Sequence, residues 1–139
     1  MKRVVLFLCT GNSCRSQMAE GIVNRELGGE WQAFSAGTNP STVNPRAIAA
    51  LKEIGIDISS HTSKHVDSFQ SVPLDLVVTV CGNAEQHCPV WLGRERRVHI
   101  GFDDPAEASG SDEEIMAVFR RVRDEIGERI VPYLSELSE

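Results

Sequence analysis

An uninterrupted apolar run near the N-terminus, Val4–Leu8, sets the narrowest limit on how this chain can fold. It contains β-branched residues and stops at the polar stretch Cys9–Ser16. A short run that is apolar on both faces is typical of a strand buried inside a parallel sheet. Apolar residues then recur at helical spacing over Met18–Leu27, before Gly28 and Gly29 end the helix. The chain is therefore expected to begin with a strand, a loop and a helix.

The same alternation continues along the chain. Strands that alternate with helices form a parallel sheet that is covered on both sides. We therefore predict an α/β fold: one domain over residues 1–139, with three layers and a four-stranded parallel sheet flanked by helices. The other expected strands cover Trp31–Ser35, Leu74–Val80 and Arg97–Gly101, and the other expected helices begin at Asn44-Pro45 and at the capping box Ser111–Glu114.

Two features of these later helices are specific predictions. The helix after Pro45 is expected to bury an apolar stripe that reaches Ile54, with Gly55 ending the helix. The helix after Ser111 is expected to be long, and Pro132 is expected to bend or end it.

Reactive side chains follow three of the expected strands. Cys9 comes directly after the first strand, Cys81 follows the strand that ends at Val80, and Asp103-Asp104 follow the last strand. In an open parallel sheet, the ligand lies beyond the C-terminal ends of the strands. We therefore expect these side chains to meet in one site.

The loop Cys9–Ser16 has the composition of an anion site. Backbone N–H groups at the start of a helix attract a tetrahedral oxyanion, and the planar guanidinium of Arg15 can bind two of its oxygens. The same groups stabilise a thiolate at Cys9, which makes Cys9 a candidate nucleophile. The Ser16 hydroxyl can donate to this thiolate, and the Asn12 side chain can brace the loop. The expected oxyanion-binding residues are Thr10, Gly11, Asn12, Ser13, Cys14, Arg15 and Ser16.

Charge and cysteine usage narrow the classes of function. With 20 acidic and 14 basic side chains the net charge is −6, which disfavours nucleic-acid binding. The N-terminal apolar run is shorter than a secretory core of roughly 7–15 residues, and no stretch approaches the roughly 20 apolar residues of a membrane span. We therefore expect a cytoplasmic protein whose disulfides form transiently. The cysteine spacings lack the short pairs of zinc sites, so no metal is expected.

Motifs along nearly the whole chain resemble one family. The Cys-x5-Arg-Ser pattern within Cys9–Glu20 resembles the low-molecular-weight tyrosine phosphatase fold, and within that superfamily the chain is similar to the thioredoxin-coupled arsenate reductases. The resemblance implies that fold, arsenate reduction in arsenic detoxification, and reduced thioredoxin as the electron donor, without a tightly bound cofactor. The other matching segments are Ser35–Gly37, His61–Ser63, Asp75–Thr79, Cys81 with Cys88-Pro89, and Gly101–Ala106.

The resemblance implies a role for each of three cysteines. Cys9 would attack arsenate while Arg15 holds the oxyanion and Asp104 protonates the departing oxygen as general acid. Cys81 would then attack Cys9, release arsenite and leave a Cys9–Cys81 disulfide. Cys88 would next attack Cys81 and form a Cys81–Cys88 disulfide that thioredoxin reduces. We expect the protein to act as a monomer.

Other polar residues near these motifs remain ambiguous in the sequence. Tyrosine phosphatases of this fold also carry a cysteine at the position of Cys14, so this cysteine does not separate the two activities. Asp103 is expected to be a structural neighbour of Asp104, although the reverse assignment stays open.

A cation site is also part of the resemblance, because some relatives bind potassium near the loop. Asn12, Glu20 and Ser35 match positions in that site, but Lys64 stands where those relatives carry an acidic residue. Our hypothesis is that the Lys64 ammonium replaces the ion and pairs with Glu20, and a solvated surface lysine is the alternative.

A tyrosine phosphatase is the main rival function, since Cys9, Arg15 and Asp104 would serve it unchanged. Phosphatases of this fold usually have proline after the Arg-Ser pair and an aromatic residue after Asp-Pro. This chain has Gln17 and Ala106 at those positions, which favours the reductase. A zinc- or arsenic-binding regulator is the weaker alternative.

Overall fold

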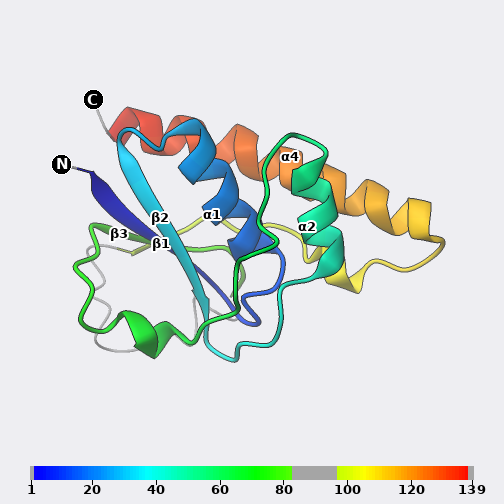
Figure 1. The fold of residues 1–139 in the computed structure, drawn as a ribbon, viewed down its shortest axis with the longest axis horizontal. Helices are drawn as coiled ribbons and strands as arrows, with labels where there is room; N and C mark the ends of the chain where they lie inside the picture. Colours follow the sequence, from blue (N-terminus) through cyan, green and yellow to red (C-terminus); the bar gives the residue numbers. More distant parts are fainter. Residues whose placement is uncertain (1, 83–96, 138–139) are drawn as a thin grey trace.

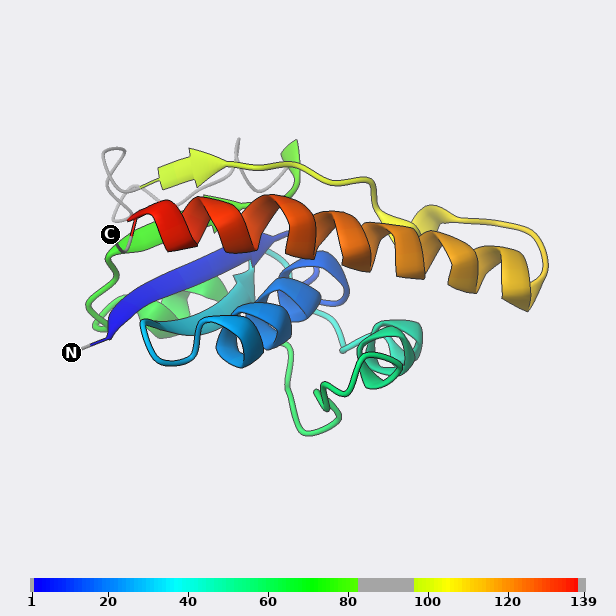
Figure 2. The ribbon, with the colours of Figure 1, turned by 90° about the horizontal axis from the view of Figure 1, so that it is seen from above.

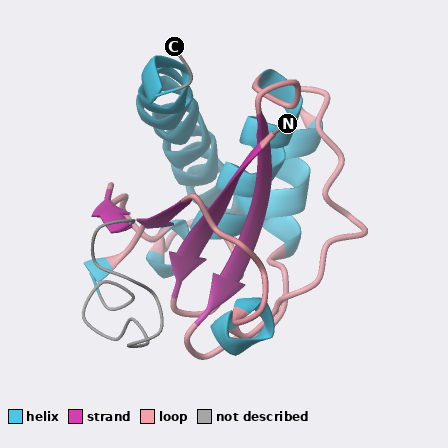
Figure 3. Cartoon of the chain, turned by 90° about the vertical axis from the view of Figure 1, so that its left-hand side faces the viewer, coloured by secondary structure: helices cyan, strands magenta, loops and turns pink. Residues whose placement is uncertain are grey.

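The predicted α/β architecture is confirmed in the computed structural model, which describes residues 2–82 and 97–137. In this part of the chain, four parallel strands lie in the order β2-β1-β3-β4, and Figure 3 shows the α-helices gathered behind them. On the other face, Phe69 packs on Phe34 with ring centroids 5.5 Å apart. The strands are β1 (Arg3–Cys9), β2 (Trp31–Gly37), β3 (Leu76–Thr79) and β4 (Arg97–His99); the helices are α1 (Arg15–Glu26), α2 (Pro45–Lys52) and α4 (Asp112–Leu137), with short 3₁₀ helices η1 (Val66–Phe69) and η3 (Pro105–Glu107) (Figure 1).

The strand order places the end of β1 at the centre of the sheet. β1 pairs with β2 on one side and with β3 on the other, so the later strands are added on both sides of β1. The ends of the strands are in register: Cys9 is aligned with Gly37, and Leu8 with Thr79. Such a switch point opens a crevice beyond the C-terminal ends of the strands. Cys9 therefore lies where an α/β sheet ordinarily binds its ligand.

The core lies between β1 and the two longest helices. The apolar run of β1 is fully buried from Val5 to Leu8, as expected for a central parallel strand. Figure 2 shows α4 running beside α1 along the length of the molecule. In residues 2–82 and 97–137, no helix has both the length and the apolar character needed to cross a membrane. The buried stripe of α4 is Phe119, Val122, Ile126, Ile130 and Leu134.

The predicted helix starts are confirmed by their capping contacts. The Asn44 side chain accepts a hydrogen bond from the Arg46 N–H at 2.8 Å, directly before Pro45 opens α2. At the start of α4, the Ser111 hydroxyl accepts the Glu114 N–H at 3.1 Å, and the Glu114 carboxylate accepts the Ser111 N–H at 3.2 Å. These reciprocal bonds form the capping box that the sequence predicts.

The prediction for β3 was too long. Regular strand pairing begins at Leu76 rather than Leu74, because at Asp75 the side-chain carboxylate accepts a hydrogen bond in place of a backbone carbonyl. The Asp75 carboxylate accepts the Val4 N–H at 2.7 Å, while the Asp75 N–H donates to the Val4 carbonyl at 2.9 Å. β4 is also shorter than predicted and ends at His99.

The prediction for Ile54 was wrong, and of the two outcomes predicted at Pro132 the helix end was wrong. Ile54 is 39% exposed, because α2 ends at Lys52 and Ile54 lies in the turn before Gly55, whose φ is +82°. Pro132 does not end α4, which continues to Leu137. Leu134 holds this last part in place: its side chain is fully buried, and its carbonyl accepts the Trp31 indole N–H at 3.2 Å. Tertiary packing thus outweighs the hydrogen bond that proline removes.

Candidate active site

The Cys9–Ser16 loop turns its carbonyl groups away from the crevice. The segment 38–44, which follows β2, donates backbone N–H groups to four of them. Because a peptide C=O and the N–H of the same peptide point in opposite directions, the N–H groups of the loop face inward. This arrangement is suited to a tetrahedral oxyanion. The four bonds join Thr38 to the Cys9 carbonyl (3.2 Å), Asn39 to Thr10 (2.8 Å), Ser41 to Gly11 (3.0 Å) and Asn44 to Ser13 (3.0 Å).

Gly37 allows β2 to approach the loop this closely. A Cβ atom at position 37 would lie 2.4 Å from the Thr10 carbonyl oxygen and 3.0 Å from the Asn12 nitrogen. Both neighbours are backbone atoms, which cannot move aside as a flexible side chain would. The glycine is therefore required by the packing of the loop against the strand.

Asn12 is the buried brace of the loop. Its φ is 48°, a left-handed conformation that asparagine tolerates better than most residues. The Asn12 side-chain amide donates to the Ser16 hydroxyl at 2.9 Å, and its oxygen accepts the Lys64 N–H at 2.8 Å and a Gln17 N–H at 3.0 Å. Asn12 thus ties the loop to the start of α1 and to Lys64 in the segment before η1.

The Cys9 sulfur lies inside this frame and is almost fully buried. It accepts the Asn12 backbone N–H at 3.2 Å and lies 2.8 Å from the Ser16 hydroxyl. Because the Ser16 oxygen already accepts the Asn12 amide, its proton is free to point at the sulfur. The Asn12 N–H and the Ser16 hydroxyl are thus both within hydrogen-bonding distance of the Cys9 sulfur.

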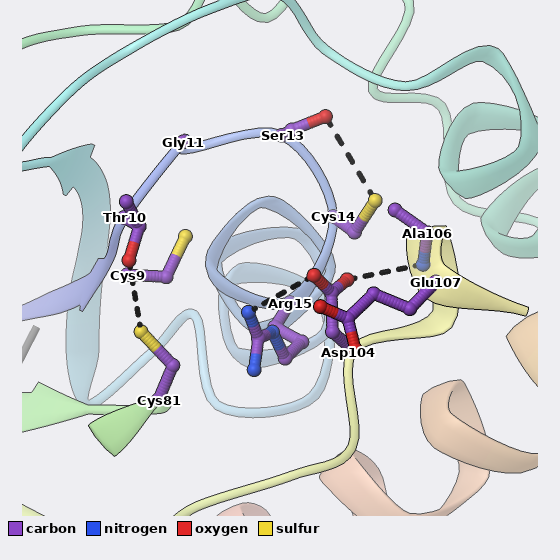
Figure 4. A pocket seen from close by; sticks show the side chains of 10 residues that line it. All are labelled: Cys9, Thr10, Gly11, Ser13, Cys14, Arg15, Cys81, Asp104, Ala106 and Glu107. Atoms are coloured by element: carbon purple, nitrogen blue, oxygen red, sulfur yellow. Dashed lines mark hydrogen bonds and ion pairs between the residues drawn. The ribbon is translucent and has the colours of Figure 1, made fainter. Parts of the chain in front are cut away.

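Cys9 lines a cavity, and Arg15 and Asp104 meet on the wall opposite this cysteine (Figure 4). The Arg15 guanidinium lies 3.5 Å from the Asp104 carboxylate and donates to the Phe102 carbonyl at 3.0 Å. Asp104 also accepts the Ala106 N–H at 3.0 Å, which caps η3. Asp103 points elsewhere: its side chain is 75% exposed and pairs with Arg121 at 3.1 Å. The geometry therefore places Asp104, and not Asp103, at the cavity.

Cys81 reaches the same cavity from the end of β3. Its sulfur is buried and lies 3.4 Å from the Thr10 hydroxyl (Figure 4). The sulfurs of Cys9, Cys14 and Cys81 are not joined to one another by a disulfide. Cys88 lies outside the described residues. The cavity measures about 560 Å³ and is lined by Cys9, Thr10, Gly11, Ser13, Cys14, Arg15, Cys81, Asp104, Ala106 and Glu107.

Cys14 should resist alkylation in the folded protein. Burial raises the pKa of its thiol to about 12, and negative charge on Asp104 and Cys9 adds to the rise. Only the thiolate reacts, so at pH 8 we expect iodoacetamide to modify Cys14 roughly 10³-fold more slowly than in the unfolded chain. Mass spectrometry of timed samples, with guanidinium-unfolded protein as the control, measures both rates. Equal rates in the two states would contradict this prediction.

The sequence-based reasoning missed a buried network beneath the loop. Gln17 is fully buried and donates to the Asn12 and Thr62 carbonyls at 3.2 and 3.0 Å. Its side-chain oxygen lies 3.0 Å from His61 Nδ1, which is also 3.5 Å from the Glu20 carboxylate. Gln17 and Glu20 lie one helical turn apart on the buried side of α1, and this pair of polar residues was the available signal for the network.

The hypothesis for Lys64 was wrong about its partner. The Lys64 ammonium donates to the Thr62 carbonyl at 2.8 Å, whereas Glu20 accepts the Ser35 hydroxyl at 2.6 Å and lies beside His61. Histidine, and not lysine, therefore faces the carboxylate. Among the described residues, no group of three or more His, Cys, Asp or Glu side chains is placed to hold a metal ion.

Comparison with known proteins agrees with this geometry. The family model of low molecular weight phosphotyrosine protein phosphatases matches residues 4–139. The chain is 60% identical over 129 residues to the arsenate reductase of Halalkalibacterium halodurans, covering 93% of both chains, and 54% identical over 128 residues to that of Bacillus subtilis, covering 92% of both.

Solved structures extend the likeness to three dimensions. An arsenate reductase in its oxidized state superposes with a TM-score of 0.83 at 34% identity, over 98% of this chain and 99% of that one. A low molecular weight protein tyrosine phosphatase from T. tengcongensis gives 0.78 at 28% identity, over 97% and 99%. The chain thus belongs to the low-molecular-weight phosphotyrosine protein phosphatase family, and within it to the group whose members are named arsenate reductases.

Proposed function

We propose that this protein is an arsenate reductase that carries out the reaction with a relay of three cysteines and is regenerated by reduced thioredoxin. The observation that carries the proposal is the position of Cys81. A phosphatase needs one nucleophilic cysteine and a water molecule, whereas a reductase needs a second thiol that can supply electrons. The cavity that holds Cys9, Arg15 and Asp104 also contains the thiol of Cys81.

The first step of the proposed reaction forms a bond between sulfur and arsenic. The inward N–H groups of the loop and Arg15 hold arsenate, and the Cys9 thiolate attacks the arsenic atom. One oxygen departs as water, with its proton supplied by Asp104 as general acid. The product is a thiol-arsenate adduct on Cys9 in which arsenic is still pentavalent.

The following steps move two electrons from the protein to arsenic. The Cys81 thiolate attacks the Cys9 sulfur, the sulfur–arsenic bond breaks, and its electron pair leaves with arsenic as arsenite. The resulting Cys9–Cys81 disulfide is attacked by Cys88, which frees Cys9 and leaves a Cys81–Cys88 disulfide. The dithiol of thioredoxin reduces that disulfide by exchange. No step requires a bound metal or cofactor.

The proposal includes the setting of the reaction. We infer that residues 1–139 act as one domain, as a monomer in the cytoplasm, where thiols are kept reduced and disulfides are transient. Arg15, the one guanidinium among the described residues that line the cavity, supports a free oxyanion as the substrate.

The direct test is arsenate-dependent oxidation of NADPH in the presence of thioredoxin and its reductase. We expect turnover that requires arsenate, the protein and thioredoxin, and that falls sharply when glutathione and glutaredoxin replace thioredoxin. The matched control is hydrolysis of an aryl phosphate by the same preparation. Rapid aryl-phosphate hydrolysis without arsenate-dependent oxidation of NADPH would instead establish the phosphatase as the function.

A further inference from the structure

The position of the Arg15 guanidinium depends on the segment that follows β4. One nitrogen donates to the Phe102 carbonyl at 3.0 Å, and the other faces Asp104 at 3.5 Å. Arg15 is the one cationic side chain among the described residues that line the cavity. Whatever fixes the segment 100–104 therefore also fixes the group that is proposed to bind the oxyanion.

The sheet holds this segment from one side. The Ile100 N–H donates to the Thr79 carbonyl at 2.9 Å, and the Phe102 N–H donates to the Val80 carbonyl at 3.1 Å. These bonds extend the pairing of β3 beyond β4. The Phe102 N–H belongs to the same peptide as the Gly101 carbonyl, so the sheet holds this peptide by its N–H and leaves the carbonyl, which points the other way, to a different partner.

Arg129 of α4 supplies the contact on that side. Its guanidinium donates to the Gly101 carbonyl at 2.9 Å and lies 4.8 Å from the centroid of the Phe102 ring. The next carbonyl along the chain, that of Phe102, accepts the hydrogen bond from Arg15. A rotation at this point would swing the Phe102 carbonyl away from Arg15.

We propose that Arg129 is a positioning residue that sets the Arg15 guanidinium for oxyanion binding through the Gly101 carbonyl and the Phe102 ring. The role needs a planar cation that can donate one N–H while its face covers an aromatic ring, which arginine provides and lysine does not. This inference rests on the proposed function in one respect only, the binding of the oxyanion by Arg15.

Arg121 offers a matched control on the same helix. Its guanidinium pairs with Asp103 at 3.1 Å and with Glu125 at 3.0 Å, and these are its ion-pair partners among the described residues. Arg121 and Arg129 both line a second pocket, separate from the cavity at Cys9, over the segment 101–103. Replacing Arg121 removes the same charge from the same surface without touching the partners of Arg15.

The experiment measures the dissociation constant of inorganic phosphate by its protection of Cys9 from iodoacetamide. We expect Arg129→Ala to weaken phosphate binding roughly tenfold and Arg129→Lys at least threefold, with Arg121→Ala within twofold of wild type. In an Arg15→Lys background, Arg129→Ala should cause less than a twofold further loss, because the group that it positions is already gone. Thermal unfolding of each variant confirms that the fold is intact.

Two results would overturn the inference. Unchanged phosphate binding in Arg129→Ala and Arg129→Lys would remove the role altogether, and an equal loss in the Arg15→Lys background would reduce it to general stability. If Arg129→Ala fails to fold, Arg129→Lys decides alone. Phosphate binding does not depend on reduction of arsenate, so failure of the proposed function and failure of this inference are separable.

Discussion

Replacement of Cys9 by serine should lower arsenate turnover by at least roughly 10⁴-fold, because the variant loses the proposed nucleophile. The serine hydroxyl would lie beside the same Asn12 N–H and Ser16 hydroxyl, but these neighbours cannot ionise an alcohol near neutral pH. The measurement is arsenate-dependent NADPH oxidation with thioredoxin and its reductase. Phosphate binding measured by isothermal titration calorimetry, which does not need the Cys9 thiol, and thermal unfolding of the variant serve as controls for the loop and the fold.

Cys81→Ser and Cys88→Ser should also stop turnover, but at different points. After exposure to arsenate, mass spectrometry should find a Cys81–Cys88 disulfide in the wild type and a trapped Cys9–Cys81 disulfide in Cys88→Ser. Cys81→Ser should contain neither disulfide and should retain phosphate binding, because the loop is unchanged. Full turnover in Cys81→Ser would remove the relay and leave a single-cysteine mechanism.

The local part of the site was predictable because it is contiguous in the chain. Cys9, Asn12, Arg15 and Ser16 lie within one strand–loop–helix unit, and their contacts follow from backbone geometry that the motif itself requires. The end of β1 at the switch point of the sheet could be anticipated from the alternation of strands and helices. The meeting of Cys81 and Asp104 in one cavity followed from the same rule.

The supports of the site could not be predicted, because they depend on contacts between distant residues. Gln17 was noticed only as a departure from the phosphatase pattern, although it is buried under the loop and contacts Thr62 and His61, 45 and 44 residues away. Arg129 reaches the Gly101 carbonyl across 28 residues. A long surface side chain has no periodic signal that would reveal such a partner.

The errors in the fold have the same origin. Local rules place a helix end at Pro132, but the burial of Leu134 and its bond to Trp31, 103 residues away, hold α4 together beyond it. Ile54 continues the helical spacing of α2, yet the chain has already turned toward Gly55. In both places tertiary context overrides a signal that is correct over a single turn.

Asp104→Asn should lower kcat for arsenate by roughly 10²–10³-fold, whereas Asp103→Asn should stay within about twofold of wild type. The two carboxylates are adjacent in sequence, but only Asp104 lines the cavity and faces Arg15 at 3.5 Å. Asparagine keeps the oxygen that accepts the Ala106 N–H, so the cap of η3 survives and the substitution removes the transferable proton. Asp103 is exposed and pairs with Arg121, which makes its variant a control for charge.

The division of the effect between kcat and KM distinguishes two roles for Asp104. A general acid acts only in the transition state, so its loss lowers kcat and kcat/KM equally and leaves the KM for arsenate nearly unchanged. If Asp104 served only to orient Arg15, its loss would weaken binding of the oxyanion, and KM would rise while kcat stayed within a few-fold of wild type. Steady-state kinetics of both variants at saturating thioredoxin separate these outcomes. An equal loss of activity in Asp103→Asn would show instead that the segment after β4, and not one carboxyl group, is what the reaction requires.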